Sequence, residues 1–220
     1  WGLGRVLRLE QPSWRVVNAD LLADSQLATA AGELVVEGAG AGAATELVWR
    51  GGERLAATLT RHAAVGGASV RGVTSSSYVI TGGLGGLGLR AASFVVERGA
   101  RALYLSSRSG VAGQESADAL SSLTGQLGVS VMCVACNAAD TYELLALGHA
   151  AAGLCSTVLH AAGALRDTLL RSMRTGDIAS VFGPKAGGAA QLQHMSTRGG
   201  ALRELLFFSS TTSLIGTVGQ

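Results

Sequence analysis

The segment TGGLGGLG, from Thr81 to Gly88, has the composition and spacing of a loop that could hold a phosphate group. Its glycines follow the pattern T-G-x-x-x-G-x-G between an apolar, strand-like run and a helix-like segment. A pyrophosphate can bind at the N-terminus of such a helix, because free N–H groups and the helix dipole favour negative charge and glycine permits close approach. The alternative is a tight strand–helix turn without a ligand. The residues expected at this nucleotide site are Thr81, Gly82, Gly83, Leu84, Gly85, Gly86, Leu87 and Gly88.

The end of the next strand-like run indicates which nucleotide the loop accepts. NAD-binding folds place a carboxylate on the ribose about 20 residues beyond the glycine loop. Here the run ends in SSRSG without a carboxylate, and Ser107 offers a hydroxyl while Arg108 offers a cation. These groups suit a 2′-phosphate, so the sequence predicts NADPH as the cofactor. The alternative is that Arg108 is an ordinary solvated arginine.

Two further pairs of side chains could do chemistry. Ser209 and Ser210 follow the apolar run LLFF, and adjacent hydroxyls at a strand end are typical of an active-site edge, although they could also cap the strand. Cys133 and Cys136 form a C-x-x-C pair of the kind found in redox and zinc sites. They lie in the apolar run VSVMCVAC without a second pair, so we interpret them as small hydrophobic residues.

The elements that must position these residues alternate regularly from Tyr78 onward. Apolar strands separated by amphipathic helices favour a parallel sheet covered on both faces, and right-handed crossovers then predict a doubly wound, Rossmann-like α/β fold. The expected strands lie within residues 77–81, 101–107, 129–137, 154–163 and 202–210. The expected helices lie within residues 87–99, 113–128, 140–153 and 176–195, with Asp140 as the N-cap of the third.

The first part of the chain, residues 1–76, has a different pattern. GRVLRL and WRVVNADL are short and strand-like, and Gly38 to Thr45 is a glycine-rich loop. The run ELVWRGGERLAATLT predicts a hairpin that turns at Gly51 and Gly52. Residues 63–77 have the composition of a linker.

The bulk composition excludes several classes of function. Hydrophobic residues make up 48% of the 220 residues and charged residues 15%, which is typical of a chain that folds around a core. A net charge of +2 and an aromatic content of 5% give no case for nucleic acid as a partner. No apolar run is long enough to predict a membrane span. Three cysteines make no disulfide framework and fit a reducing, cytoplasmic setting.

Four motifs together resemble the ketoreductase domains of modular type I polyketide synthases. The resemblance is carried, in order, by YVITGGLGGLGLRAASFVVERGARALYLSSRSG, VLHAAGALRDTLL, VFGPKAGGAAQL and LLFFSSTTSLIG. These domains belong to the short-chain dehydrogenase/reductase superfamily, and animal fatty acid synthase ketoreductases are related to them. The match is close over residues 77–220 and looser over residues 1–76. It implies a partial structural subdomain with a linker at 1–76, followed by an NADPH-binding catalytic subdomain at 77–220.

The resemblance implies reduction of a β-ketoacyl group carried on the phosphopantetheine of an acyl carrier protein, with NADPH giving the hydride and a tyrosine the proton. Other polyketide synthase domains in the same polypeptide would also be partners. Ser210 matches the serine that hydrogen-bonds to the substrate carbonyl, and Lys185 matches the catalytic lysine that also contacts the cofactor. By itself Lys185 resembles a surface charge, and His160 a structural residue. The other cofactor contacts that the resemblance implies are Asn137, Ala138, His160, Ala161, Ala162 and Gly163.

The chain departs from the family pattern after the third strand and keeps part of a stereochemical motif. Asn137 stands where the family often has an aspartate that contacts adenine, so adenine recognition is expected to persist with altered strength. Leu165, Arg166 and Asp167 keep the last aspartate of the L-x-D triplet that is usual in ketoreductases giving a D-hydroxy product. Ile215 stands where the opposite class has tryptophan. Both signs imply the D-hydroxy, B-type outcome.

The proton donor of the implied reaction is not found within the chain. None of Tyr78, Tyr104 and Tyr142 matches the catalytic tyrosine, which by the family spacing falls just beyond Gln220. We therefore expect the sequence to be cut at both ends and this fragment alone to be inactive. The alternatives are a fatty acid synthase type ketoreductase, a catalytically silent module that binds NADPH or only keeps the fold, and a free-standing short-chain reductase for a small ketone.

Overall fold

The chain forms two compact units in a computed structural model that describes residues 1–21, 45–50, 53–58, 76–151, 155, 157–197, 202 and 204–219. The first unit comprises Trp1–Gly66, Asp167–Ser172 and Ser210–Gln220. The second unit comprises Gly67–Arg166 and Met173–Ser209. The first unit therefore takes up two segments that follow strands of the second. The expected division at residues 76 and 77 stays a prediction.

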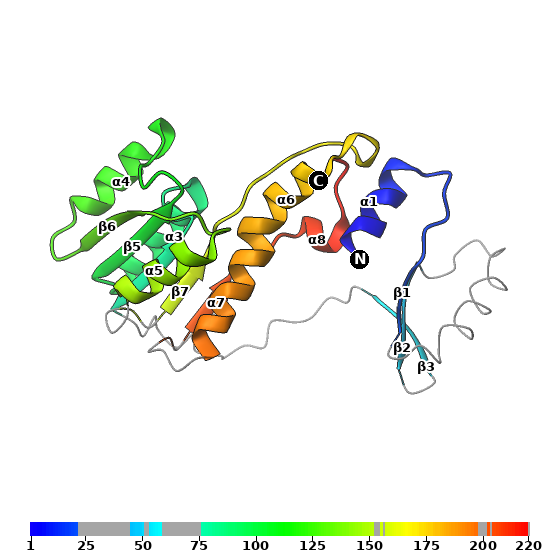
Figure 1. Ribbon diagram of the computed structural model, residues 1–220, viewed down its shortest axis with the longest axis horizontal. Coiled ribbons are helices and arrows are strands. Elements are labelled where there is room, and N and C mark those ends of the chain that lie inside the picture. The colour runs from blue at the N-terminus through cyan, green and yellow to red at the C-terminus, as the bar shows by residue number, and fades with distance from the viewer. Residues whose placement is uncertain are drawn as a thin grey trace. The chain divides into compact units, whose positions relative to one another are not determined.

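A parallel five-stranded sheet forms the centre of the second unit, with the strand order β6-β5-β4-β7-β8 (Figure 1). Every residue of the strands β4 and β7 is buried, which explains the consecutive apolar residues Tyr78–Ile80 and Val158–Leu159 within them. The strands are β4 (Ser77–Thr81), β5 (Ala102–Ser107), β6 (Ser130–Ala135), β7 (Thr157–His160) and β8 (Glu204–Phe207). The predicted Rossmann-like α/β fold is confirmed.

The helices of the second unit follow the predicted alternation with the strands. The N-cap predicted at Asp140 is confirmed, because its Oδ1 accepts hydrogen bonds from the backbone N–H groups of Tyr142 and Glu143. The region predicted as one helix over 176–195 consists of two α-helices joined by a π-helical turn. The elements are α3 (Gly86–Glu97), η3 (Gln114–Ser116), α4 (Ala117–Thr124), α5 (Thr141–Ala151), α6 (Thr175–Phe182), the π-turn η5 (Gly183–Gly187) and α7 (Gly188–Thr197). Within the described ranges, no helix is long and apolar enough to cross a membrane.

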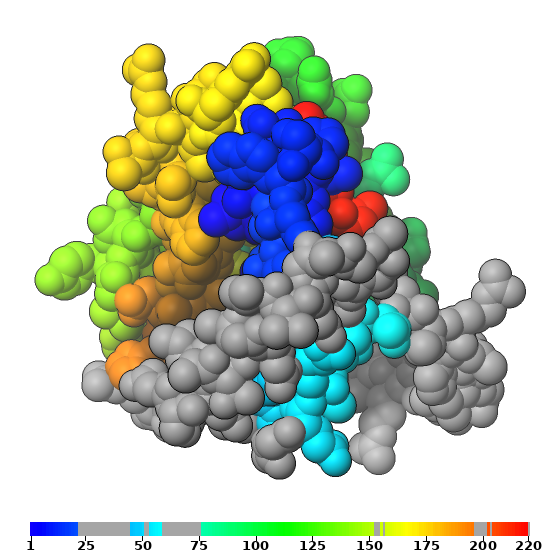
Figure 2. Space-filling model, turned by 90° about the vertical axis from the view of Figure 1, so that its right-hand side faces the viewer, coloured from blue at the N-terminus to red at the C-terminus, as the bar shows by residue number. Residues whose placement is uncertain are grey.

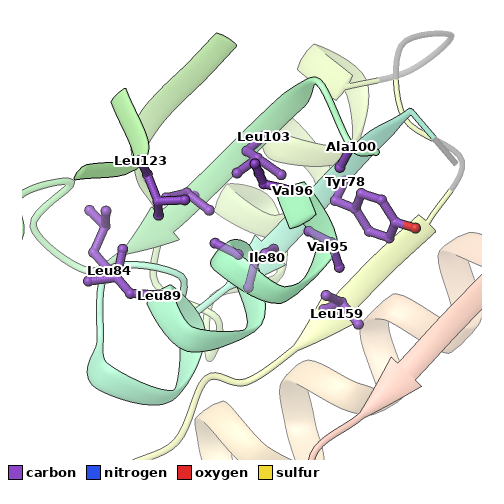
Figure 3. Close-up of a cluster of buried hydrophobic side chains, with 12 residues drawn as sticks. Tyr78, Ile80, Leu84, Leu89, Val95, Val96, Ala100, Leu103, Leu123 and Leu159 are labelled. Carbon is purple, nitrogen blue, oxygen red and sulfur yellow. The ribbon is translucent and has the colours of Figure 1, made fainter. Parts of the chain in front are cut away.

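Two hydrophobic clusters hold the helices on the sheet. The first joins α3 and α4 to one face, where Val95 and Val96 of α3 lie against Ile80 and Leu103 of the sheet (Figure 3). The second cluster contains Val79 and Val158, whose side chains alternate with those of the first cluster and so point to the other face. It is completed from α5, α7 and the β6–α5 connection by Leu144, Leu147, Ala151, Leu192, Cys136 and Ala138. Because the two clusters lie on opposite faces of the sheet, the position of a residue along its strand determines which face its side chain shares at the carboxyl ends of the strands.

The cysteines of the C-x-x-C pair have different environments. Cys136 is buried in the second cluster, and burial raises the pKa of its thiol to about 11, with smaller contributions from the carboxylates of Glu143 and Asp140. Cys133 is exposed on β6. Among the described residues, no group of potential ligands could hold a metal ion. Cys136 therefore behaves as the small hydrophobic residue that the sequence predicted.

The first unit contains a second, three-stranded sheet with the order β1-β2-β3. The predicted hairpin is confirmed, because β2 and β3 pair in antiparallel fashion with Arg50 opposite Glu53. The elements are α1 (Gly2–Glu10), β1 (Asn18–Leu21), β2 (Glu46–Arg50), β3 (Glu53–Ala56), η4 (Leu170–Ser172) and α8 (Thr212–Ile215). The Gly51–Gly52 turn, the loop from Gly38 except Thr45, and the predicted linker before residue 76 lie outside the described residues.

The prediction of a strand in GRVLRL is wrong, because this run lies in helix α1. Arg5 donates to both carboxylate oxygens of Glu46, and Arg8 donates to one of them. Residues three apart share a face only in a helix, so the helical form lets both arginines reach one carboxylate. The hydrogen bond from Arg5 is the main reason why the pKa of Glu46 is lowered. This contact, which is distant in sequence, stabilises the helical form.

Candidate active site

The glycine loop connects the end of β4 to the start of α3 through a tight turn. Gly82 has a φ of 70°, a left-handed conformation that glycine adopts without strain. The N–H of Gly83 donates to the carbonyl oxygens of Ile80 (3.1 Å) and Ser106 (2.8 Å), which fastens the turn to β5. The predicted strand–loop–helix context is therefore present.

The loop is packed so closely that side chains are excluded from three of its glycines, Gly82, Gly83 and Gly88. A Cβ added to Gly82 would lie 2.7 Å from the Cα and N atoms of Ala162, in the segment that follows β7. A Cβ added to Gly88 would lie 2.3 Å from the carbonyl oxygen of Gly82. At Gly86 the same added atom would meet nothing within 4 Å. The loop is thus closed toward the protein, where its backbone packs at Gly82 and Gly88, and open to a ligand at Gly86, the first residue of α3.

The N-terminus of α3 fits a pyrophosphate. Its N-cap residue, Gly85, provides no side-chain hydrogen bond, so the first backbone N–H groups of the helix are not capped by the protein. Gly86 and Leu87, in the first turn, are exposed. The open space at Gly86 leaves an anion free to approach these donors. The residues present therefore fit the phosphates of a dinucleotide cofactor.

The end of β5 carries the two residues predicted to select the nucleotide. Ser107 Oγ accepts a hydrogen bond from the N–H of Gly110 at 3.1 Å, so its side chain helps to hold the turn after the strand. Arg108 is exposed, and within the described part of the chain no hydrogen bond or ion pair holds its guanidinium group. Arg108 is therefore free to meet an anionic ligand.

Asn137 and Ala138 lie just beyond the end of β6. The Oδ1 atom of Asn137 accepts a hydrogen bond from the backbone N–H of Ala139 at 3.1 Å. The backbone N–H of Asn137 donates to Oε2 of Glu143 at 2.7 Å. These bonds leave the side-chain amide N–H groups of Asn137 as donors for a base. Ala138 is buried and packs in the second hydrophobic cluster. This turn is therefore able to contact the adenine of a nucleotide cofactor.

A buried polar row crosses the sheet at the carboxyl ends of β5, β4 and β7. Ser106, Thr81 and His160 stand in register, so their side chains point to the same face. Thr81 Oγ1 and His160 Nδ1 are 2.7 Å apart. Among the described residues, Ser106 Oγ and His160 Nε2 have no hydrogen-bond partner. Ser106 is not among the predicted site residues, although its place beside Thr81 at the end of the neighbouring strand is a signal that could have identified it.

The tautomer of His160 follows from its surroundings. Its ring lies against the start of α7, because a Cβ added to Gly188 would be 3.0 Å from His160 Cε1. The backbone of Lys185 and Pro184 favours the protonated ring, whereas burial, the larger effect, lowers the pKa of His160. In the neutral ring, Nδ1 accepts a hydrogen bond from the Thr81 hydroxyl, and the proton lies on Nε2, which faces the backbone of Lys185 and Pro184 without a hydrogen bond to it. We infer that tautomer, which links the glycine loop to the π-turn.

The lowered pKa of His160 predicts a loss of stability in mild acid. The unfolded chain takes up a proton below the ordinary histidine pKa of about 6.5, while the folded chain resists protonation until a lower pH. Stability should therefore fall as the pH drops below about 6.5, by up to about 1.4 kcal/mol per pH unit. Urea denaturation between pH 7 and 5 measures it. The His160→Asn variant should lose most of this slope, and His149→Asn, at an exposed position, should keep it.

Lys185 lies in the π-turn that joins α6 to α7. A Cβ added to Gly163 would lie 3.0 Å from Lys185 Cε, so the stem of the lysine passes over the segment that follows β7. The π-turn contains Pro184, and π-turns inside helices often occur at functional sites. The structure thus places Lys185 beside Gly163 in the second unit.

Ser210 belongs to the first unit and begins the turn into α8. Its Oγ lies 2.8 Å from Thr212 Oγ1 and accepts from the N–H of Thr212 at 3.2 Å. Two residues earlier, the N–H of Phe208 donates to the carbonyl oxygen of His160, the last residue of β7. The exposed Ser210 hydroxyl therefore follows a chain segment that is bonded to the carboxyl end of the second unit's sheet.

The predicted site residues divide between the two units. The glycine loop, Ser107, Arg108, Asn137, the 160–163 segment and Lys185 all lie at or just beyond the carboxyl ends of strands in the second unit, or on the π-turn beside them. This edge is where open α/β sheets bind ligands. Leu165 and Arg166 are exposed in the same unit, whereas Asp167 and Ser210 belong to the first.

Comparisons with known proteins agree on one family. The model of the KR domain family matches residues 76–220. The polyketide synthase GfsA of Streptomyces halstedii is 34% identical over 224 residues, which cover 100% of this chain and 3% of that protein. A phenolphthiocerol/phthiocerol polyketide synthase of Mycobacterium tuberculosis is 34% identical over 226 residues, which cover 100% of this chain and 12% of that protein.

A solved structure of A-type ketoreductases from a modular polyketide synthase shares the fold. It superposes with a TM-score of 0.84 at 33% identity, and the match covers 100% of this chain and 46% of that one. The chain therefore spans less than half of that structure, and a small part of the two polyketide synthases.

Proposed function

The chain belongs to the KR domain family of polyketide synthases, and from this premise we propose that it takes part in the NADPH-dependent reduction of a β-ketoacyl group to a β-hydroxyacyl group. KR domains are oxidoreductases of the Rossmann-like, short-chain dehydrogenase/reductase type and bind a nicotinamide cofactor. The acyl group would be held by an acyl carrier protein, with other polyketide synthase domains in the same polypeptide. The observation that carries the proposal is the glycine loop, closed toward the protein and open at the uncapped end of α3.

NADPH bound at this edge would supply a hydride for the ketone carbon. The N–H groups at the start of α3 would hold its pyrophosphate, and Ser107 and Arg108 its 2′-phosphate. The donors left on Asn137 would meet the adenine, and the segment from His160 to Gly163 would run beside the nicotinamide ribose. The close packing of Gly82 on Ala162 supports a common wall formed by the loop and that segment.

Two side chains would act on the substrate carbonyl. Ser210 would donate its hydroxyl proton in a hydrogen bond to the oxygen, and so polarise the bond. The Lys185 ammonium group would stabilise negative charge that develops on that oxygen and lower the pKa of a proton donor. The exposure of both residues supports these roles, because a substrate can reach them.

The stereochemical proposal is the D-hydroxy, B-type product. It is supported by Asp167, the last residue of the L-x-D triplet, and by Ile215 in place of tryptophan. The solved structure compared above is of A-type ketoreductases, so similarity of fold alone does not separate the types. The chirality of the product decides the point, and an L-hydroxy product would exclude the proposal.

Removing the Arg108 side chain should weaken NADPH binding by about 10- to 100-fold, because hydrogen bonds to charged groups contribute about 1.5–3 kcal/mol. NADH lacks the 2′-phosphate, so its affinity should not change in Arg108→Ala. Fluorescence titration of both cofactors measures the two constants. Arg98→Ala is the control, because Arg98 is another exposed arginine and caps the C-terminal end of α3, away from the glycine loop at its N-terminus. Equal losses for NADPH and NADH would contradict the assignment.

A second candidate is a silent module that binds NADPH without turnover. It would keep the glycine loop and the uncapped end of α3, which fit the cofactor, and it would need no group that acts on the substrate. NADPH binding without oxidation of NADPH by a β-ketoacyl thioester would support this candidate over the reductase.

A further inference from the structure

Glu10, the last residue of α1, accepts hydrogen bonds from two segments far away in the sequence. Its Oε2 atom accepts from the N–H of Leu170 at 2.8 Å, and its Oε1 atom accepts from the N–H of Gly219 at 3.1 Å. The two segments are also joined directly, because the N–H of Thr168 donates to the carbonyl oxygen of Gly219 at 2.7 Å. One carboxylate thus closes a ring of three hydrogen bonds within the first unit.

The tail from Ser210 to Gly219 is held along α1 at further points. Arg5 donates to the carbonyl oxygen of Ser213 at 2.7 Å. Gly216 is so close to α1 that an added Cβ would lie 3.0 Å from Arg5 Cβ. Both views show the tail, in red, beside the blue helix (Figures 1 and 2). The tail therefore packs along α1, and Glu10 connects α1 to the segment Asp167–Ser172 through its hydrogen bond with Leu170.

The position of Glu10 is not explained by the stability of α1 itself. A negative charge at the C-terminal end of a helix opposes the helix dipole. Glu10 stands at that end, two residues beyond Arg8, which is the favourable charge for the last turn. The hydrogen bonds that it accepts from two distant N–H groups explain why a carboxylate stands at this position.

We propose that Glu10 is a positioning residue that sets the relative geometry of the two segments on which the reduction depends. One segment, Thr168–Leu170, directly follows the Leu165–Asp167 triplet, and the other begins at Ser210. The inference rests on the proposed function, and it assigns a role in substrate orientation to a residue of α1 that touches neither substrate nor cofactor. Removing the carboxylate should loosen both segments together and weaken the choice between the two faces of the ketone.

Amide hydrogen exchange tests the bridge in the protein without ligand. In Glu10→Ala both acceptor oxygens are removed, so we expect the amides of Leu170 and Gly219 to exchange at least about tenfold faster, while those of β4 and β7 stay unchanged. Glu53→Ala removes the same charge from the exposed strand β3 and should change neither amide. Unchanged exchange at Leu170 and Gly219 would overturn the inference, as would faster exchange at only one of them.

The ratio of D- to L-hydroxy products gives the readout that a loss of folded protein would not move. It is measured in a polyketide synthase polypeptide that carries this chain, with a β-ketoacyl thioester as substrate. We expect the minor isomer to increase at least about fivefold in Glu10→Ala, and Glu53→Ala to match the wild type. An unchanged ratio with a lower rate would reduce Glu10 to a stabilising residue. A wild-type protein that consumes no NADPH would contradict the proposed function, and the exchange experiment would still decide whether Glu10 couples the segments.

Discussion

Replacing Gly82 with alanine is expected to lower the free energy of unfolding by about 2 to 5 kcal/mol and to abolish NADPH binding. The left-handed conformation costs an alanine about 1–2 kcal/mol, and forcing a methyl group into a packed site costs about 1–3 kcal/mol. Both costs apply, because Gly82 has a φ of 70° and an added Cβ would lie 2.7 Å from the backbone of Ala162. Backbone cannot rotate away as a side chain can, so the loop and the segment after β7 must separate. Urea denaturation and fluorescence titration with NADPH measure the two effects.

Gly86→Ala is the matched control, because it adds the same methyl group to the same loop where no atom lies within 4 Å. Alanine is the better helix former at this first residue of α3, so the free energy of unfolding should change by less than about 1 kcal/mol. The methyl group would nevertheless stand in the path of the pyrophosphate, so NADPH affinity should fall by at least about tenfold. A Gly86→Ala protein that binds NADPH as tightly as the wild type would place the cofactor elsewhere. A Gly82→Ala protein with unchanged stability would contradict the loop geometry.

The second unit could be predicted from the sequence because its signals are local. Strand β4 is buried on both faces, so the residues between its polar ends are all apolar, and α3 repeats apolar residues at the spacing of one helical face. Asp140 could be recognised as an N-cap from its type and its place before an apolar run. Parallel order then follows from the alternation itself, since crossover helices require it. The glycine loop was predictable for the same reason, because its spacing and context lie within a few residues.

The elements that were predicted wrongly carry mixed local signals or depend on partners distant in sequence. The run Gly2–Glu10 has apolar residues at the helical spacing of Leu3, Val6 and Leu7, but its end alternates apolar and polar residues as a strand does. The ion pairs of Arg5 and Arg8 with Glu46 favour the helical form. Pro184 signals a disturbance inside a helix, but no local pattern separates a π-turn from a kink or a break. No local pattern explains Glu10 either, because an acidic residue at the C-terminal end of a helix is unfavourable by itself. Its position is explained only by the two hydrogen bonds that it accepts from distant segments.

Replacing Lys185 with methionine is expected to lower kcat for β-ketoacyl reduction by about 100-fold or more. Methionine fills the space of the lysine stem over Gly163 but carries no charge, so the positive group near the developing oxyanion is lost while the packing is kept. Lys185 lies in a π-turn that is exposed on one side and rests against His160 and Gly163 on the other, so its removal should leave the sheet intact. The kinetics are measured in a polyketide synthase polypeptide that carries this chain and turns over a β-ketoacyl thioester.

Two further variants separate charge from position. Arg90→Met removes a cation from the exposed side of α3 and should leave kcat within about twofold of the wild type. Gly163→Ala keeps the Lys185 charge but places a Cβ where the Lys185 Cε would be 3.0 Å away, so the lysine must shift. A near-attack geometry is sensitive to displacements of this size, and kcat should fall by an intermediate amount with the NADPH affinity nearly unchanged. If Lys185→Met keeps more than half of the wild-type kcat, the lysine is an ordinary surface charge. If Gly163→Ala is as inactive as Lys185→Met and also fails to bind NADPH, the segment after β7 serves the cofactor and not the lysine.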